Sequence, residues 1–196
     1  ASTRGDLLDP LTSEGELYEP LPDGELRCYA CGHRCLIKPG RRGICKVRFN
    51  QEGVLRVPWG YVGAFQCDPT EKKPFFHLYP GSDTLTFGML GCDFHCGYCQ
   101  NWVTSQAMRD PGSDVSALGL RPITPQDMVD YGLSMGARVV GSSYNEPLIT
   151  SEWAVSVFRP AREAGLTCAY ISNGNATREV LEYIRPYVTA YKIDLK

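Results

Sequence analysis

Apolar positions in the second half of the chain form short runs that alternate with amphipathic stretches. Four runs have the length and composition of buried strands, and they cover residues 84–91, 137–142, 166–172 and 188–195. Helix-like stretches separate them. Strand, helix and strand repeated in this way predict right-handed βαβ units and a parallel sheet.

The helix-like stretches carry recognisable signals. Thr124 is a candidate N-cap with Pro125 at the first helical position, and Thr177 is a candidate cap for the last stretch. Pro160 lies inside the middle stretch and predicts a kink or an early break. Residues 103–123 have few periodic apolar positions and predict a long loop, which in such folds lies near the site.

The first third of the chain has a different character. Its start is acidic and rich in Pro and Gly, which predicts an extended lead-in that packs on another part or stays mobile. The runs 44–49 and 54–61, joined by a turn-rich tetrapeptide, predict a hairpin within a cysteine-bearing module. We therefore expect a lead-in, a cysteine module, a connector and a main α/β domain at residues 1–27, 28–66, 67–83 and 84–196.

The α/β domain predicts about four βα units, too few to close an eight-stranded barrel. The sequence stops at Lys196, at the end of the fourth predicted strand. We expect either a fragment of a longer protein or a sheet that another subunit completes, and we favour the fragment. An unpaired parallel edge strand would make an isolated fragment prone to associate.

Composition excludes several classes of function. The net charge is -2 with acids and bases mixed along the chain, so no basic surface points to a nucleic-acid partner. No apolar run approaches the roughly 20 residues that a membrane span needs. The nine cysteines are an odd number with no visible signal peptide, which argues against a secreted disulfide protein. Seven of them fall into two tight groups, which favours metal ligands in a cytoplasmic protein.

The first group is Cys92, Cys96 and Cys99, directly after the first predicted strand. A [4Fe–4S] cluster normally takes four thiolates, so three on one loop would leave one iron open to a substrate or cofactor. The alternatives are a structural zinc loop or buried thiols. Zinc sites are usually built from paired C-x2-C knuckles, so the compact triplet favours an iron–sulfur cluster.

Polar residues also follow the other three predicted strands. They are 143–147, 172–175 and 192–196, and each lies where a strand ends. Because the carboxyl ends of parallel strands meet at one edge, we expect one polar rim there that includes the cysteine loop.

With these motifs the chain resembles the radical SAM superfamily, in its pyruvate formate-lyase activating-enzyme branch. It is most similar to the radical SAM proteins of the AmmeMemoRadiSam system. The segments that carry the resemblance are 72–82, 91–102, 144–147, 172–174 and 194–196. The resemblance implies a partial (β/α) barrel of the radical SAM type, preceded by the small Cys-rich hairpin module. It also implies a [4Fe–4S] cluster on Cys92, Cys96 and Cys99 with S-adenosylmethionine at the open iron.

The resemblance further implies where S-adenosylmethionine binds. Asp194 would meet its ammonium group and Lys196 its carboxylate, while the flat aromatic ring of Tyr98 suits the adenine. The segment after the second strand often reads Gly-Gly-Glu-Pro in the activating enzymes, whereas here it reads Tyr-Asn-Glu-Pro at 144–147. The cofactor-binding candidates are Tyr98, Asn145, Glu146, Ser172, Asn173, Asp194 and Lys196.

The expected function is reductive cleavage of S-adenosylmethionine to a 5′-deoxyadenosyl radical, by an enzyme of the glycyl-radical-activating type or one that modifies a protein or small molecule. Partners implied by the resemblance are an electron donor of the flavodoxin or ferredoxin type, a protein substrate, and Memo-like and AMMECR1-like proteins. The alternative is a non-catalytic metal-binding module whose sites are structural or sense redox state. RNA methylation is disfavoured because no basic patch is present.

The second cysteine group is Cys28, Cys31, Cys35 and Cys45. Four thiolates at this spacing suit a closed site that holds either zinc or a second, fully ligated [4Fe–4S] cluster. The sequence does not choose between the two. Cys67 and Cys168 belong to neither group, and Cys168 lies in an apolar run that predicts a core position.

Overall fold

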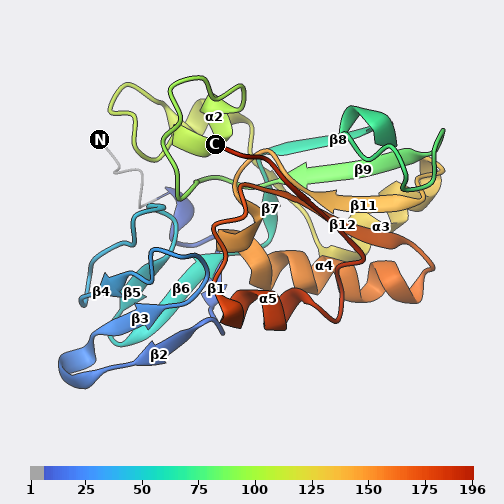
Figure 1. Cartoon of the computed structure of the whole chain (residues 1–196). Coiled ribbons are helices and arrows are strands. Elements are labelled where there is room, and N and C mark those ends of the chain that lie inside the picture. The colour runs from blue at the N-terminus through green and yellow to red at the C-terminus, as the bar shows by residue number, and fades with distance from the viewer. Residues whose placement is uncertain (1–6) are drawn as a thin grey trace.

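The computed structural model describes residues 7–196, apart from the side chains of Val115 and Ser116. Its largest element is a five-stranded sheet in the order β13-β12-β11-β9-β8 (Figure 1). The strands are β8 (Ala64–Pro69), β9 (Asp83–Gly88), β11 (Val139–Ser142), β12 (Thr167–Ser172) and β13 (Ala190–Ile193). The last four are parallel, as the apolar runs predict, and β8 joins β9 antiparallel.

The parallel strands are added one after another on the same side of β9. Their pairing places Val140 beside both Leu85 and Cys168, and Tyr170 beside Tyr191. An order in which each crossover moves the same way keeps all the connecting helices on one face. The helices α3 (Pro125–Ser134), α4 (Ser151–Glu163) and α5 (Arg178–Ile184) do lie along one face of the sheet (Figure 1).

The helix ends confirm the capping predictions. Thr124 forms a reciprocal capping box with Asp127, and the Thr177 hydroxyl accepts a hydrogen bond from the Val180 amide. The early break expected at Pro160 is wrong, because α4 continues to Glu163. Phe158 and its buried neighbours pack this helix against the sheet, and packing outweighs the one backbone hydrogen bond that proline removes.

The amino-terminal third folds into two small sheets. One has the order β1-β6-β5 and the other β2-β3-β4. Their strands are β1 (Thr12–Glu14), β2 (Tyr18–Pro20), β3 (Leu26–Cys28), β4 (Leu36–Ile37), β5 (Phe49–Gln51) and β6 (Val54–Pro58). The predicted hairpin is present, but its first strand begins only at Phe49. Residues 43–46 instead form a turn, in which the Lys46 amide donates to the Gly43 carbonyl.

The lead-in packs on the rest of the chain, because β1 and β2 pair with β6 and β3. Its first six residues lie outside the described part. The expected boundary between module and connector falls inside β8, which belongs to the large sheet. The predicted loop at 103–123 begins inside α2 (Trp102–Gln106).

The remaining elements are β7 (Tyr61–Val62), which pairs with β10 (Arg121–Pro122), and the short 3-10 helices η1 (Pro22–Gly24), η2 (Thr70–Lys72), η3 (Val115–Leu118) and η4 (Pro147–Thr150).

One hydrophobic cluster runs through both halves of the described chain. It includes Leu26, Cys28 and Val47 from the cysteine module together with Phe87 and Phe158 from the α/β part. An ion pair also crosses this boundary: the Arg48 guanidinium binds Glu152 in α4 through contacts of 2.7 and 2.8 Å. Both side chains are 1% exposed. The module therefore has no core of its own.

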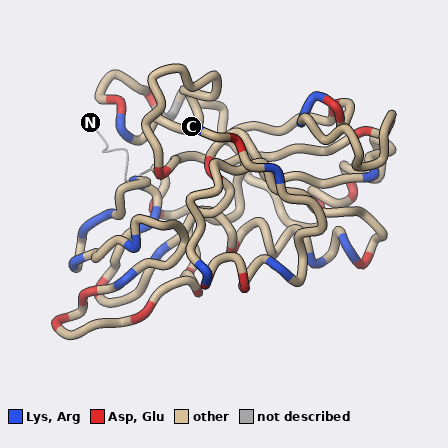
Figure 2. The backbone as a smooth tube through the Cα atoms, viewed as in Figure 1, with Lys and Arg blue, Asp and Glu red and all other residues tan. Residues whose placement is uncertain are grey.

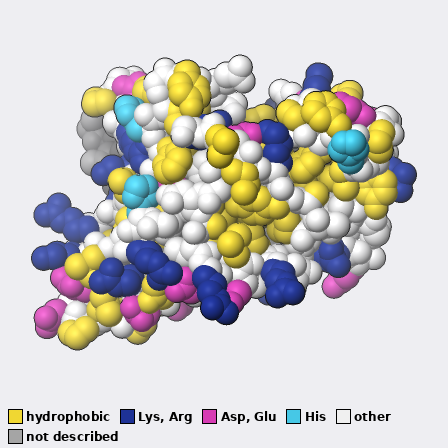
Figure 3. Space-filling view, viewed as in Figure 1, with side chains coloured by type: hydrophobic (Ala, Val, Ile, Leu, Met, Phe, Trp, Pro, Cys, Tyr) yellow, Lys and Arg dark blue, Asp and Glu magenta, His cyan; other side chains and the backbone are white. Residues whose placement is uncertain are grey.

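The surface carries acidic and basic residues intermixed (Figure 2). Hydrophobic side chains gather at the β13 and α5 edge of the sheet (Figure 3), where Leu181, Ile184, Val188 and Tyr191 line a groove. Within the described residues, no helix has the length and apolar character that crossing a membrane requires.

Candidate functional site

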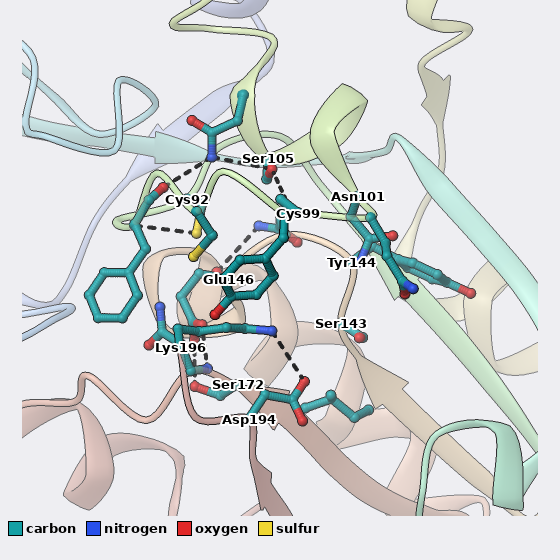
Figure 4. A pocket seen from close by; sticks show the side chains of 18 residues that line it. Cys92, Cys99, Asn101, Ser105, Ser143, Tyr144, Glu146, Ser172, Asp194 and Lys196 are labelled. Carbon is teal, nitrogen blue, oxygen red and sulfur yellow. Dashed lines mark hydrogen bonds and ion pairs between the residues drawn. The ribbon is translucent and has the colours of Figure 1, made fainter.

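A cavity of about 340 Å³ opens at the carboxyl ends of the parallel strands (Figure 4). The loops after β9, β11, β12 and β13 all contribute to its wall, as the strand-end argument predicts. Every candidate residue of the cluster and S-adenosylmethionine sets lines it: Cys92, Cys96, Tyr98, Cys99, Asn145, Glu146, Ser172, Asn173, Asp194 and Lys196. The volume falls in the range of about 300–1,000 Å³ that is typical of small-molecule sites.

The cysteine loop leaves β9 through a tight approach at Gly91. This residue has φ 93°, and a Cβ there would press against Val47 of the cysteine module. The Gly91 amide donates to the Thr104 carbonyl of α2 at 2.9 Å. Helix α2 also supports the far end of the loop, since Ser105 Oγ lies 3.3 Å from Cys99 Sγ.

Arg109 clamps the loop from outside the cavity. Its guanidinium donates to the carbonyl oxygens of Cys92 at 2.8 Å and Phe94 at 2.5 Å. It also donates to the Ile44 carbonyl at 2.8 Å, next to Cys45 of the module. A planar guanidinium presents five donors in a rigid fork, so it can bind three carbonyls on separate segments in a fixed geometry.

Asp93 holds the same loop from the opposite side. Its carboxylate is 2% exposed and accepts hydrogen bonds from Asn173 Nδ2 at 2.7 Å and Asn175 Nδ2 at 2.9 Å. The ring of His33 lies 3.2 Å from the Asp93 carbonyl oxygen. The loop is thus tied to the end of β12 and to the cysteine module together.

The segment after β11 takes a conformation that usually belongs to glycine. Tyr144 has φ 69°, so tyrosine here occupies the left-handed region. The Lys73 side chain contacts the Tyr144 ring, because Lys73 Nζ lies 3.2 Å from the Tyr144 hydroxyl and over the face of the ring. A Cβ at Gly88 would collide with the Ser143 carbonyl, so β9 and this segment touch directly. Tyr144 thus adopts a left-handed backbone conformation at a position where glycine would be free of strain.

Glu146 presents a buried carboxyl group to the cavity. It is 3% exposed and accepts hydrogen bonds from Ser172 Oγ at 2.6 Å and the Asn173 amide at 2.8 Å. Burial raises the pKa of Glu146 to about 7, against the lowering effect of these donors, and the charge of Asp93 raises it further. Glu146 therefore titrates near neutral pH.

The carboxyl end of β13 carries an ion-pair cluster. Asp194 pairs with Lys192 and lies 3.9 Å from Lys196 Nζ. Lys192 was not among the candidate residues, yet it is the nearest partner of the carboxylate. Tyr98, across the cavity, is 69% exposed and leaves its ring free to receive a flat ligand.

The amino-terminal cysteines lie behind the cysteine loop. Cys28, Cys31 and Cys45 are buried, and Cys35 Sγ accepts a hydrogen bond from the Ile44 amide at 3.5 Å. Burial raises the pKa of Cys45 to about 11 and that of Cys31 still further. The charge of Cys28 contributes to both shifts, so these sulfur atoms lie near one another. Arg48 lies close to Cys28 and Cys45, and its Nε has no hydrogen-bond partner among the described residues.

In residues 7–196, no three or more His, Cys, Asp or Glu side chains are already gathered as ligands of one metal ion. Burial raises the pKa of Cys92 to about 12, and a metal ion would be needed to hold it as a thiolate. The donor chemistry nevertheless fits the two implied groups. The three thiols all line the cavity, together with carboxyl, amide, hydroxyl and ammonium groups and an exposed aromatic ring.

Four residues outside the candidate set control the site's geometry. Asp93, Arg109 and Asn175 position the cysteine loop, and Lys192 neutralises Asp194. Asp93 could have been noticed, since a charged residue inside a cysteine motif after a buried strand must find partners. Asn175 and Lys192 belong to the predicted polar rim, but their partners depend on segments that meet only in the fold, and Arg109 gave no signal in the sequence.

No protein-family profile matches the chain. It is similar to the uncharacterized protein MJ0808 of Methanocaldococcus jannaschii, with 36% identity over 184 residues that cover 93% of this chain and 53% of that protein. It is also similar to the uncharacterized protein MJ0674 of the same organism, with 25% identity over 177 residues, 86% of this chain and 45% of that protein. The chain thus spans about half the length of these two archaeal relatives.

Proposed function

We propose that the chain is the part of a radical SAM enzyme that binds a [4Fe–4S] cluster and S-adenosylmethionine. The observation that carries the proposal is that one cavity is lined both by three cysteines of one loop and by polar residues from the ends of three further strands. The strand order, with all crossovers in one direction and the helices on one face, supports a partial (β/α) barrel of this type. When bound, the cluster would supply the electron that cleaves S-adenosylmethionine into methionine and a 5′-deoxyadenosyl radical.

The chain's own residues would bind and orient the two groups. Cys92, Cys96 and Cys99 would hold the cluster as thiolates. Asp194 and Lys196 offer an anion and a cation for the amino-acid end of S-adenosylmethionine. Glu146 and its donors form a fixed, buried acceptor nearby.

The proposal also includes an electron donor and a substrate, which are named only by class. An electron donor of the flavodoxin or ferredoxin type would reduce the cluster, and the substrate would be a protein or small molecule. The alternative function is a non-catalytic metal-binding module. In that alternative, the buried thiols Cys28, Cys31 and Cys45 would be ligands of a structural metal in the amino-terminal group.

The decisive experiment is anaerobic reconstitution of the chain with ferrous iron and sulfide, followed by reduction in the presence of S-adenosylmethionine. The proposal predicts equimolar 5′-deoxyadenosine and methionine, measured by chromatography and mass spectrometry. Iron binding without either product would favour the non-catalytic module. Absence of iron on the three loop cysteines would overturn the proposal.

Affinity for S-adenosylmethionine should rise with pH. Because the pKa of Glu146 is about 7, its ionised fraction grows by about tenfold between pH 6 and pH 8. An ionised Glu146 attracts the ligand's positive charges, so the dissociation constant should fall by up to about tenfold over this range. Isothermal titration at several pH values measures this trend. In Glu146→Gln the trend should flatten, and an equal pH dependence in that variant would exclude Glu146 as its source.

We also propose a closed metal site for Cys28, Cys31, Cys35 and Cys45, with zinc or a second [4Fe–4S] cluster as occupant. Arg48 supports this, because its buried guanidinium lies beside Cys28 and Cys45 and would offset the negative charge of a thiolate set. A bound structural metal can add on the order of 10 kcal/mol to folding.

The double variant Cys28→Ala, Cys31→Ala should therefore lose metal-dependent protection of residues 28–66. Limited proteolysis with and without zinc measures this, and Cys168→Ala is a matched control because Cys168 is buried in β12 away from both groups. Unchanged protection in the double variant would show that the cysteines do not form a structural site. Because the module shares its core with the sheet, we expect cleavage to spread to neighbouring segments.

A further inference from the structure

The candidate cluster loop is held from behind by the amino-terminal cysteine module. Two contacts come from the turn between Cys31 and Cys35. The ring of His33 lies 3.2 Å from the Asp93 carbonyl oxygen, and the Gly32 amide donates to the Asn175 carbonyl at 2.8 Å. The fit is close, since a Cβ at Gly32 would collide with the side-chain oxygen of Asn175.

Between these two contacts lies the hydrogen bond from Asn175 Nδ2 to Asp93 Oδ2, at 2.9 Å. Asp93 is 2% exposed and forms no ion pair within residues 7–196. A buried carboxylate without a cation depends on its hydrogen-bond donors, so the loss of either amide is costly. Asn173 supplies the other amide donor, but it lines the cavity, whereas Asn175 does not, and the Cys92 thiol adds a longer contact of 3.8 Å to Asp93 Oδ1.

A second set of contacts between the cysteine module and the loop does not use the Asp93 side chain. Arg109 joins the Ile44 carbonyl, next to Cys45, to the carbonyl oxygens of Cys92 and Phe94. Both sets of contacts thus connect residues next to cysteines of the amino-terminal group with the loop that carries Cys92, Cys96 and Cys99. Neither is explained by the hydrophobic core, because every contact in them is polar.

We propose that Asp93 and Asn175 form a joint through which the amino-terminal cysteine module positions the candidate cluster loop. Order in the turn at residues 31–35 is transmitted through this pair to residues 92–99. Asp93 and Asn175 are positioning residues, since neither lines the cavity. The consequence for iron and S-adenosylmethionine rests on the proposed function, whereas the mechanical link does not.

The first test uses the metal-free chain and hydrogen–deuterium exchange read by mass spectrometry. Asn175→Ala removes one donor to the buried carboxylate, and exchange should quicken by about tenfold in peptides covering residues 31–35 and 92–99. The pair can be restored with its polarity reversed in Asp93→Asn, Asn175→Asp, where the new amide at 93 donates to the new carboxylate at 175. This swap should return exchange to within about twofold of the wild-type rate, whereas Asp93→Asn alone should not.

Thr177→Ala is the matched control for general loosening of the same interface. The Thr177 hydroxyl donates to the Tyr29 carbonyl of the module and also caps α5. Its loss should quicken exchange at the start of α5 and leave residues 92–99 at the wild-type rate. Equal quickening of residues 92–99 in Thr177→Ala and Asn175→Ala, or a swap variant as loose as the single variants, would overturn the joint.

The second test measures how the contact between Asp93 and Asn175 affects retention of iron by the loop. After reconstitution, Asn175→Ala should lose iron from the loop to a chelator about tenfold faster than wild type, and the swap variant should recover. Wild-type chain that keeps no iron on the three cysteines would refute the proposed function, while exchange still decides the joint. Iron retention and exchange that are both unchanged in Asn175→Ala would refute the joint alone.

Discussion

Reconstituted Cys96→Ala chain should lose the visible absorbance of a [4Fe–4S] cluster and form 5′-deoxyadenosine at least about 100-fold more slowly than wild type. Loss of a supporting residue around a metal centre already costs about 10- to 100-fold, so loss of a direct ligand should cost at least as much. The same result is expected for Cys92→Ala and Cys99→Ala, because all three thiols line one cavity. Iron content, absorbance and product yield measured on one preparation check the prediction.

Cys67→Ala provides the matched control. Cys67 is a half-buried cysteine of β8 outside both cysteine groups. It should keep wild-type iron content and product yield. If Cys96→Ala retained cleavage while Cys67→Ala lost it, the assignment of ligands to the loop after β9 would be wrong.

The largest effect on stability should come from Glu152→Ala. This change leaves the buried Arg48 guanidinium without its carboxylate partner, and breaking such a pair costs about 3–5 kcal/mol. Glu152 also accepts hydrogen bonds from the Glu16 and Leu17 amides, so the lead-in loses an anchor as well. The melting temperature should fall by about 6–20 °C, since each kcal/mol corresponds to about 2–4 °C in a chain of this size.

Two comparisons isolate the buried pair. Glu182→Ala removes an exposed ion pair with Arg178 and should change stability by less than about 1 kcal/mol. The double variant Arg48→Met, Glu152→Leu replaces both charges with apolar groups and should be more stable than Glu152→Ala alone. A Glu152→Ala melting temperature equal to that of Glu182→Ala would contradict the assigned role.

The pH dependence of stability follows from the same pair. Burial opposes ionisation of Glu152, but the charge and hydrogen bonds of Arg48 outweigh burial and lower its pKa. A carboxyl whose pKa is lower in the folded state contributes stability above its unfolded pKa, and that contribution is lost as the pH falls through the folded value. Acid unfolding of wild type should therefore show a loss of stability that Glu152→Gln lacks.

Sequence patterns predicted the local features of the fold well. The parallel strands have buried runs that period alone can detect, and Thr124 and Thr177 cap their helices through contacts three residues away. The patterns failed where distant contacts decide the outcome. Pro160 stays helical in a helix that packs on the sheet, and residues 43–46 form a turn instead of pairing, next to Arg48, which reaches Glu152 across the core.

The same distinction applies to the candidate site. Which residues share the cavity could be predicted, because parallel strands bring their carboxyl ends together. The contacts that orient those residues could not, because the partners of Asp93, Arg109 and Asn175 lie 15 to 82 positions away along the chain. Pairwise polar contacts at such separations leave no periodic trace in a single sequence.

Further strands could extend the sheet and the cavity at β13, which is an edge strand of the described sheet. β13 has only β12 as a neighbour in the described sheet, and its outer flank meets the apolar groove beside α5. Any further strand that adds there in parallel, from the same polypeptide or from a partner, ends on the side of the cavity occupied by Asp194 and Lys196. Under the proposed function, the residues that would bind the cofactor therefore belong to this chain, while strands added beyond β13 would form the wall that selects a substrate and could vary without disturbing the thiol loop.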